Sequence, residues 1–226
     1  MDRNQHNLCS RLLKRLEDAG VLKHIVLVGS WCMPCYSAYF SKIDYRPLIR
    51  TRDIDLLIPL PHKMMKTVDV ESLLKDLNFV INFKGSSGYM QFVHSDIMLE
   101  FLVPERGRGT DKPYNIPELG INAAAIRYLD FLAGRTIKAH LGGVEICVPH
   151  PVNFCLHKLM ICKRRGNSVK SENDRRQGVY ILRCLIEMKE LDSIRKAAAG
   201  MPVSWQKLIK TSLVNTADED LNSQVF

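Results

Sequence analysis

The sequence has little of what marks membrane, secreted or repeat proteins. No run approaches the roughly 18 consecutive apolar residues that a membrane span requires. The opening residues MDRNQHNLCS lack the apolar stretch of a signal peptide, and we find neither an internal repeat nor a low-complexity tract. We therefore expect a cytoplasmic protein without a membrane partner. The apolar share of 46% in 226 residues is ordinary for a globular chain of one large or two small domains.

Acidic residues are in deficit, with 24 Asp and Glu against 32 Lys and Arg, which gives a net charge of +8. The excess is densest in residues 158–176, where Glu172 and Asp174 are the acids. The basic residues of this segment are Lys158, Lys163, Arg164, Arg165, Lys170, Arg175 and Arg176. Such a cluster suits the phosphates of a nucleotide or of nucleic acid, although a solvated helix face would give the same pattern.

Apolar periodicity predicts an α/β half over residues 1–150 and a smaller, helical and basic half over 151–226. In the first half we expect helices at 7–19, 31–41 and 69–77, the last with Asp69 as its N-cap. The strands expected are 24–28, 53–58, 79–83, 89–94, 97–103, 127–132, 136–141 and 144–148. Hairpins are expected through Ser95-Asp96 and Gly142-Gly143, a loop at 104–117, and a frayed end beyond the helical pattern near residue 213.

Two aspartates one residue apart carry the strongest functional signal. Asp53 and Asp55 alternate with Ile54 and Leu56, so both carboxylates should leave the same face of a short strand. Like charges held this close repel each other, and a divalent cation relieves the repulsion. Glu100 lies between apolar residues of another predicted strand and also needs a partner or a metal. If the two strands are neighbours, the three acids can hold metal ions around a phosphoryl group.

These motifs resemble the nucleotidyltransferase superfamily that includes DNA polymerase β. The matching features, in order, are the strand ending in Gly29-Ser30, the acid-x-acid strand, and the later acid Glu100 between apolar residues. The resemblance covers residues 24–180 and is nearest to bacterial minimal nucleotidyltransferases, close to the toxin enzymes of abortive-infection toxin–antitoxin pairs. Thr51 to Leu57 matches that branch's T-x-D-I-D-L-L. One departure is a long gap from Gly29 to Asp53, which an enlarged helix or loop at 31–49 would absorb.

The resemblance implies a polymerase-β-type mixed sheet with helices, followed by a small helical C-terminal lobe, with ATP or another NTP bound between them. It implies that Asp53, Asp55 and Glu100 are catalytic and bind Mg²⁺, or Mn²⁺ in its place. The nucleotide-binding residues that we predict are Gly29, Ser30, Arg52, Lys158, Lys170 and Asp174. A snorkelling lysine and an ordinary surface pair are the plainer interpretations of the last three.

Two cysteine patterns suggest other chemistry. Trp31–Cys35 reads WCMPC, like a thioredoxin active site, where a thiolate at a helix start attacks a disulfide. That interpretation leaves the three acids unexplained, and two small thiols packing a helix are a plainer one. A zinc site lacks the tight spacing of a knuckle, so buried thiols and a capping histidine are favoured. Its ligands would be Cys147, His150, Cys155, His157 and Cys162. The P-loop pattern G-x-x-x-x-G-K-[ST] occurs nowhere.

We therefore predict an Mg²⁺-dependent nucleotidyltransferase. It would transfer a nucleoside monophosphate from an NTP to a hydroxyl of RNA, protein or a small molecule and release pyrophosphate. An antitoxin-like partner follows from the resemblance alone. Two alternatives stay open at this point: a catalytically silent nucleotide-binding protein of the same fold, and a thiol oxidoreductase acting through Cys32 and Cys35.

Overall fold

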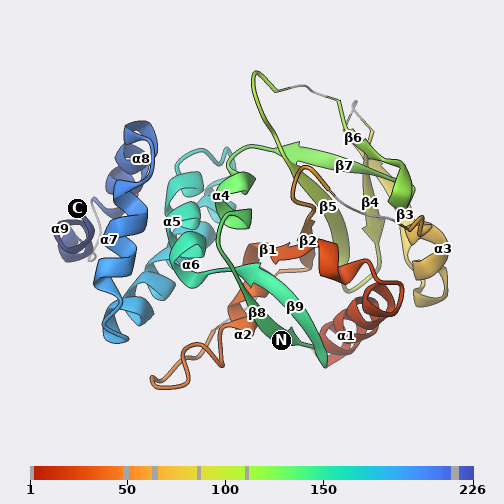
Figure 1. Cartoon of the computed structure of the whole chain (residues 1–226), viewed down its shortest axis with the longest axis horizontal. Helices are drawn as coiled ribbons and strands as arrows, with labels where there is room; N and C mark the ends of the chain where they lie inside the picture. The colour runs from red at the N-terminus through yellow and green to blue at the C-terminus, as the bar shows by residue number, and fades with distance from the viewer. Residues whose placement is uncertain (1–2, 48–50, 63–65, 86–87, 110–111, 215–218) are drawn as a thin grey trace. The chain divides into compact units, whose positions relative to one another are not determined.

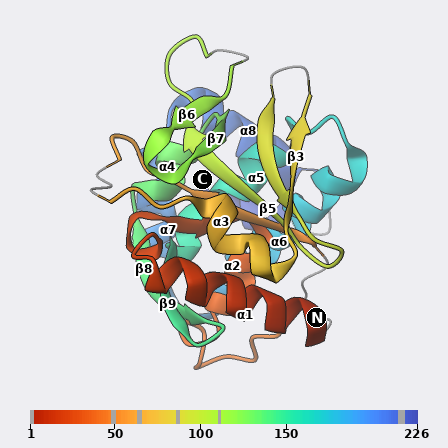
Figure 2. The same ribbon diagram turned by 90° about the vertical axis from the view of Figure 1, so that its right-hand side faces the viewer.

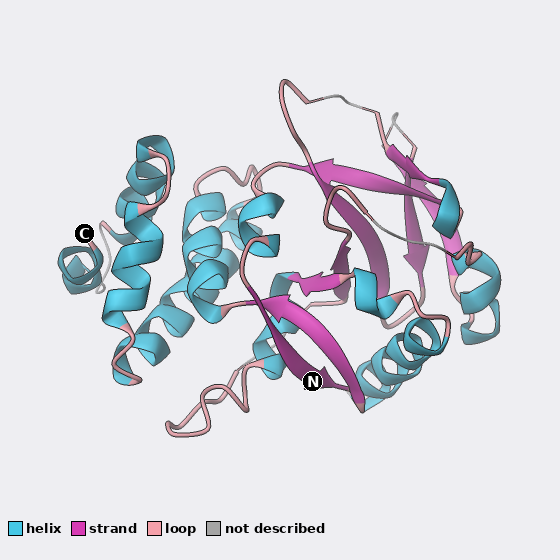
Figure 3. Cartoon of the chain, in the orientation of Figure 1, coloured by secondary structure: helices cyan, strands magenta, loops and turns pink. Residues whose placement is uncertain are grey.

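The computed structural model describes residues 3–47, 51–62, 66–85, 88–109, 112–214 and 219–226. It forms two compact units. Unit 1 consists of Met1–Ala38 and Pro47–Pro149, and unit 2 of Tyr39–Arg46 and His150–Phe226. The described strands belong to unit 1, whereas unit 2 is built from helices (Figure 3). This mixed α+β architecture confirms the predicted fold class. Within the described ranges, no helix is long and apolar enough to cross a membrane.

A mixed sheet forms the centre of unit 1 (Figure 1). Its strands run in the order β3-β4-β5-β2-β1-β9-β8, and β7 pairs with both β5 and β6. The strand bounds are β1 Val26–Val28, β2 Asp53–Leu57, β3 Val80–Lys84, β4 Tyr89–Val93, β5 Met98–Pro104, β6 Tyr114–Ile116, β7 Ile121–Ile126, β8 Thr136–Leu141 and β9 Val144–Pro149. The pairs β1–β9, β2–β5 and β5–β7 are parallel, and the others are antiparallel.

Helices and short 3-10 turns accompany the sheet in unit 1. They are α1 Arg3–Asp18, η1 Leu22–His24, η2 Gly29–Trp31, α2 Cys32–Cys35, α3 Val70–Leu74, η3 Lys75–Leu77, η4 Pro117–Leu119 and α4 Leu129–Ala133. Helix α1 contributes the buried stripe of Leu8, Leu12, Leu13 and Leu16, and it lies beside α3 (Figure 2). Asp69 is the N-cap of α3, because its carboxylate accepts the backbone N–H of Ser72 at 3.3 Å.

The two faces of β2 differ in character. Ile54 and Leu56 are fully buried on one face, and Asp53 and Asp55 are half-buried on the other. The acidic face becomes apolar further along the strand, at Leu57. There it joins a core cluster of Val26, Val28, Leu57 and Leu102 with Leu129 and Leu132 of α4. Helix α4 therefore packs over one half of this face, and the carboxylates stand on the other half.

Several predicted elements are confirmed, and four predictions are wrong. The expected loop 104–117 contains strand β6 near its end, because residues 114–116 pair with β7. The expected strand 127–132 is replaced by α4, and the strand lies earlier, as β7. Tyr128 has φ +71°, which breaks the extended chain, and Leu129 and Leu132 then enter the core at helical spacing. The expected helix 31–41 stops after α2, and residues 36–42 form turns. The end of the chain is not wholly frayed, because α9 forms there.

The long gap from Gly29 to Asp53 is absorbed by a loop, part of which belongs to the helical unit; residues 48 and 49 of the expected 31–49 enlargement lie outside the described residues. Tyr39 donates from its hydroxyl to the Glu190 carboxylate at 2.7 Å, and the rings of Tyr45 and Tyr180 lie 5.6 Å apart. These contacts explain why residues 36–46 do not continue the helix: the aromatic side chains are held by unit 2. The helices of unit 2 are α5 Pro151–Cys162, α6 Ser168–Glu187, α7 Leu191–Ala199, α8 Val203–Leu213 and α9 Glu219–Val225.

Candidate active site

Three carboxylates stand on one face of the sheet in unit 1. Strands β2 and β5 are parallel neighbours, and Asp55 pairs directly with Glu100. Paired residues on adjacent strands point to the same face, and Asp53 joins them because side chains repeat with period 2. Adjacent strands lie about 4.8 Å apart, so the acids of β2 and the acid of β5 are near neighbours. The structure thus brings together the residues that the sequence separates by up to 47 positions.

Gly29 makes room for one of these carboxylates. It follows β1 and has φ +73°, a backbone conformation that residues other than glycine rarely adopt. A Cβ atom built on Gly29 would overlap Asp55 Oδ2 and lie 3.3 Å from Asp55 Cγ. The antiparallel pairing of Val28 with Asp55 causes this closeness, because it sets the end of β1 beside the acid. The glycine of the predicted Gly-Ser motif is therefore in place beside the carboxylate, with half-buried Ser30 next to it.

Glu100 is held by two partners from the β3–β4 hairpin. Gln91 Nε2 donates a hydrogen bond to Glu100 Oε1, and Lys84 Nζ lies 3.4 Å from the same oxygen. Both contacts are made to Oε1 of Glu100, and neither is made to Oε2. As the side chains stand, no three His, Cys, Asp or Glu residues of the described chain are arranged to hold a metal ion.

The donor set nevertheless fits Mg²⁺. Carboxylate oxygens are the ligands that this hard ion prefers, and it accepts one or two of them together with phosphate oxygens. Asp53 and Asp55 are only half-buried, so an ion can reach them from solvent. Glu100 stands on the same face, at the strand position paired with Asp55. When bound, Mg²⁺ would neutralise triphosphate oxygens beside the aspartates.

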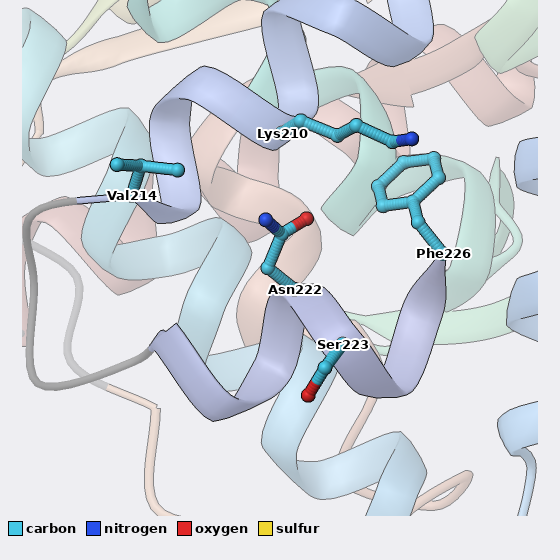
Figure 4. A pocket seen from close by; sticks show the side chains of 5 residues that line it. All are labelled: Lys210, Val214, Asn222, Ser223 and Phe226. Atoms are coloured by element: carbon cyan, nitrogen blue, oxygen red, sulfur yellow. The ribbon is translucent and has the colours of Figure 1, made fainter.

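A hollow of about 230 Å³ opens beside Glu100. Ala124 and Ala125 of β7 are among its lining residues. The other lining residues are Lys84, Tyr89, Met90, Gln91, Glu100, Phe101 and Ile126. A larger hollow of about 490 Å³ lies in unit 2 between α8 and α9 (Figure 4). It is lined by Lys210, Val214, Asn222, Ser223 and Phe226, which offer no carboxylate side chain for a metal.

Arg52 precedes the acidic strand and is held in place by the β4–β5 turn. Its guanidinium donates to the His94 carbonyl at 2.8 Å, and its own carbonyl accepts the N–H of Met98 at 2.8 Å. The guanidinium remains exposed, next in sequence to Asp53. Its predicted role in binding the nucleotide stays a prediction.

The remaining nucleotide-binding candidates belong to unit 2. Lys158 is 5% exposed, and its ammonium lies 2.5 Å from Asp174 Oδ1. Arg165 Nε lies 2.8 Å from the second oxygen of the same carboxylate. Burial acts to raise the pKa of Asp174, but the two cations outweigh it and the pKa is lowered. The buried ion pair of Asp174 is thus with Lys158, whereas Lys170 lies in the first turn of α6, where its N–H is capped by Asn167. Binding of a triphosphate by these residues stays a prediction.

The cysteine patterns do not form reactive or metal sites in the described residues. Cys32 and Cys35 are buried, and their thiols donate to the carbonyls of Leu27 and Trp31 at 3.2 and 3.5 Å. Burial raises the pKa of Cys35 to about 12, which is opposite to what a reactive thiolate requires. His150 is the N-cap of α5, as the capping interpretation expected, because its Nδ1 accepts the N–H of Val152.

Sequence reasoning missed Gln91 and Lys84 as neighbours of Glu100. The signal was present, because a hairpin turning at Ser95-Asp96 pairs residue 91 with residue 100. The observed register of β4 and β5 has this pairing.

Comparison with known proteins defines the class. A family model described as nucleotidyltransferase matches residues 7–200, most of the chain. The chain therefore belongs to this nucleotidyltransferase family, and the activity of the family is the transfer of nucleotide groups. No protein with curated annotation matches the sequence significantly.

One solved structure supports the fold, and two others have weaker similarity. A crystal structure of an antigenic nucleotidyltransferase-like protein from Paracoccidioides brasiliensis has 15% identity and a TM-score of 0.51, covering 100% of this chain and 94% of that one. Two structures of the antibiotic-resistance factor ANT(2'')-Ia have 12% and 11% identity and TM-scores of 0.46 and 0.44. They cover 87% and 92% of this chain and 97% of their own, and one holds adenylyl-2''-tobramycin. At such identities the likeness concerns the fold alone.

Proposed function

We propose that the protein transfers a nucleoside monophosphate from an NTP to a hydroxyl group in an Mg²⁺-dependent reaction that releases pyrophosphate. The observation that carries this proposal is the placement of Asp53, Asp55 and Glu100 on one sheet face, with Gly29 against Asp55. Family membership supplies the reaction class. The acceptor is a hydroxyl of RNA, of a protein or of a small molecule.

In the proposed reaction, the acceptor oxygen bonds to the α-phosphorus as the bond from that phosphorus to the bridging oxygen breaks. Pyrophosphate leaves with the bonding electrons, and the proton of the acceptor hydroxyl passes to Glu100. Asp53 and Asp55 would hold Mg²⁺, which would neutralise triphosphate oxygens, and backbone N–H groups near Gly29 and Ser30 would bind the phosphates. Positioning and charge neutralisation, rather than covalent chemistry by the protein, account for the rate.

The hollow beside Glu100 is where we place the acceptor hydroxyl. This recess in unit 1 has Glu100 in its wall, together with Ala124 and Ala125 of β7. Its volume of about 230 Å³ suits a single sugar ring or side chain rather than a bulky group. If the acceptor is an RNA end or a protein, only the group that carries the reacting hydroxyl would enter the hollow.

The test compares wild type with Asp53→Asn and Asp55→Asn. Each protein is incubated with each α-labelled NTP, Mg²⁺, and total RNA, lysate protein or a small-molecule extract. We expect label to be transferred by wild type and reduced at least about 100-fold in each variant. Glu145→Gln is the matched control, because Glu145 is an exposed strand acid paired with Lys138 at 2.7 Å.

Three results of this test differ in meaning. Transfer that survives both aspartate substitutions would refute the assignment of the acids. Mg²⁺-dependent NTP binding without transfer to any acceptor would support the silent nucleotide-binding alternative. Transfer lost in the aspartate variants and kept in Glu145→Gln supports the enzyme.

The resemblance to toxin enzymes also predicts a protein partner that silences the activity. Co-purification with the product of a neighbouring gene, followed by loss of transferase activity on adding that product, would test it. Location in the cytoplasm stays a prediction from the sequence.

A further inference from the structure

A row of polar side chains crosses the sheet beside the acids. Asn82 on β3 pairs with Gln91 on β4, Gln91 pairs with Glu100 on β5, and Glu100 pairs with Asp55 on β2. Directly paired residues share a face, so these four side chains form one line across four strands. Gln91 is the buried member, at 4% exposure, whereas Asn82 is exposed.

The hydrogen bonds along this row have a direction. Asn82 Nδ2 donates to Gln91 Oε1 at 3.3 Å, and Gln91 Nε2 donates to Glu100 Oε1. A glutamine amide has one accepting and one donating end, so the donor from Asn82 turns the donating end of Gln91 towards Glu100. A buried amide with an unpaired end is costly, which favours this single orientation.

We propose that Gln91, oriented by Asn82, is a positioning residue for the reaction: it holds Glu100 by Oε1 and leaves Oε2 for the acceptor hydroxyl. The inference rests on the proposed function of Glu100. Lys84 contacts the same Oε1 at 3.4 Å, so both partners restrain one oxygen and keep the other out of their bonds. Neither Asn82 nor Gln91 needs to touch the nucleotide.

The most informative substitution is Asn82→Asp. It nearly preserves size at an exposed position, so folding should survive. The new carboxylate can only accept, and Gln91 then turns its Nε2 towards β3 and its carbonyl towards Glu100. Two oxygens facing each other repel, which should displace Glu100. Asn82→Ala is the matched control, because it removes the donor without reversing the amide.

We expect Asn82→Asp and Gln91→Leu each to lower kcat by about 10- to 100-fold, the effect of one hydrogen bond to a charged group. The KM for NTP should change less than about threefold, because the triphosphate contacts are untouched. Asn82→Ala should lower kcat less than about fivefold. In the double variant, Asn82→Asp should add nothing to Gln91→Leu, since its effect passes through the missing amide.

A second readout does not need activity. In ¹⁵N-labelled protein without nucleotide, the side-chain amide of Gln91 should give a distinct NMR signal. That signal should shift strongly in Glu100→Ala and in Asn82→Asp, and little in Asn82→Ala. If wild type transfers no nucleotide but these shifts appear, the proposed function fails and the orientation of Gln91 stands.

Two outcomes would overturn the inference. One is an Asn82→Asp variant with the kcat of Asn82→Ala. The other is an Asn82→Asp effect that persists in full on the Gln91→Leu background, which would show that added negative charge acts on the site directly.

Discussion

Replacing Gly29 by alanine tests the centre of the site, and the chain contains a matched control. Gly29 has φ +73° and Gly20 has φ +74°, so an alanine at either position carries the same backbone penalty. That penalty is about 1–2 kcal/mol for a left-handed conformation. The two positions differ in their surroundings. A Cβ on Gly20 has no atom within 4 Å, whereas a Cβ on Gly29 overlaps Asp55 Oδ2.

We therefore expect Gly20→Ala and Gly29→Ala to lower the free energy of unfolding by similar amounts, about 1–2 kcal/mol, with more for Gly29→Ala if Asp55 cannot move away. Only Gly29→Ala should damage catalysis. The added methyl must displace the Asp55 carboxylate, and a misplacement of about 1 Å at a reacting centre can cost about 100-fold in rate.

The assay measures nucleotide transfer and denaturant unfolding on the same preparations. Unfolding should be followed by circular dichroism and by tryptophan fluorescence, because two units need not unfold together. Equal transferase activities in the two alanine variants, at equal stability, would refute the placement of Asp55 as a ligand beside Gly29. A stable Gly29→Ala protein with normal Mg²⁺ dependence would do the same.

Three further predictions concern burial. Lys158→Met should lower the stability of unit 2 by about 3 kcal/mol, measured by urea unfolding, because it leaves the Asp174 carboxylate buried with Arg165 alone. Burial lowers the pKa of His157 to about 3. Below about pH 6.5 the His157 imidazole is therefore protonated in the unfolded chain but stays neutral in the folded chain. Stability should therefore fall as the pH drops from about 6.5 towards 3, by at most about 1.4 kcal/mol per pH unit, and His157→Leu should remove that part of the slope in acid-titrated unfolding curves. Cys32 and Cys35 should resist alkylation at pH 8 in the folded protein and react on unfolding, as mass spectrometry would detect; rapid native labelling would contradict their burial.

The acidic face was predictable because it depends on local rules. Period-2 alternation places Asp53 with Asp55, and the match of Glu100 to a later acid in the family's pattern indicated the third carboxylate. That β5 lies beside β2 rather than elsewhere in the sheet is a tertiary fact, and no local pattern states it. The resemblance to known nucleotidyltransferases carried that step.

The errors in secondary structure have tertiary causes. Strand β7 reads INAAAI, and its alanines favour helix over strand, yet pairing with β5 and β6 overrides that preference. The residues predicted as the strand 127–132 form α4 instead, once Tyr128 turns the chain. Residues 36–41 were predicted to be helical, and the contacts of Tyr39 and Tyr45 within unit 2 prevent the helix from continuing.

The charge cluster at 158–176 contains contacts that composition alone does not reveal. Lys158 looked like a side chain ready to meet a phosphate, and a lysine on an apolar helix usually extends to solvent. Its ammonium is instead buried against Asp174, where Arg165 also binds. The identity of a lysine's partner sixteen residues away is set by how α5 and α6 pack, which local periodicity does not reveal.

Tyr39–Arg46 belongs to the helical unit, and this has a consequence for the design of fragments. Because this segment is inserted between β1 and β2, neither unit is a continuous piece of chain. A fragment ending at residue 149 would leave the ring of Tyr45 without Tyr180 and the hydroxyl of Tyr39 without Glu190. During synthesis, too, those aromatic residues leave the ribosome more than a hundred residues before their partners, so the helical unit cannot mature until Tyr180 and Glu190 have been translated.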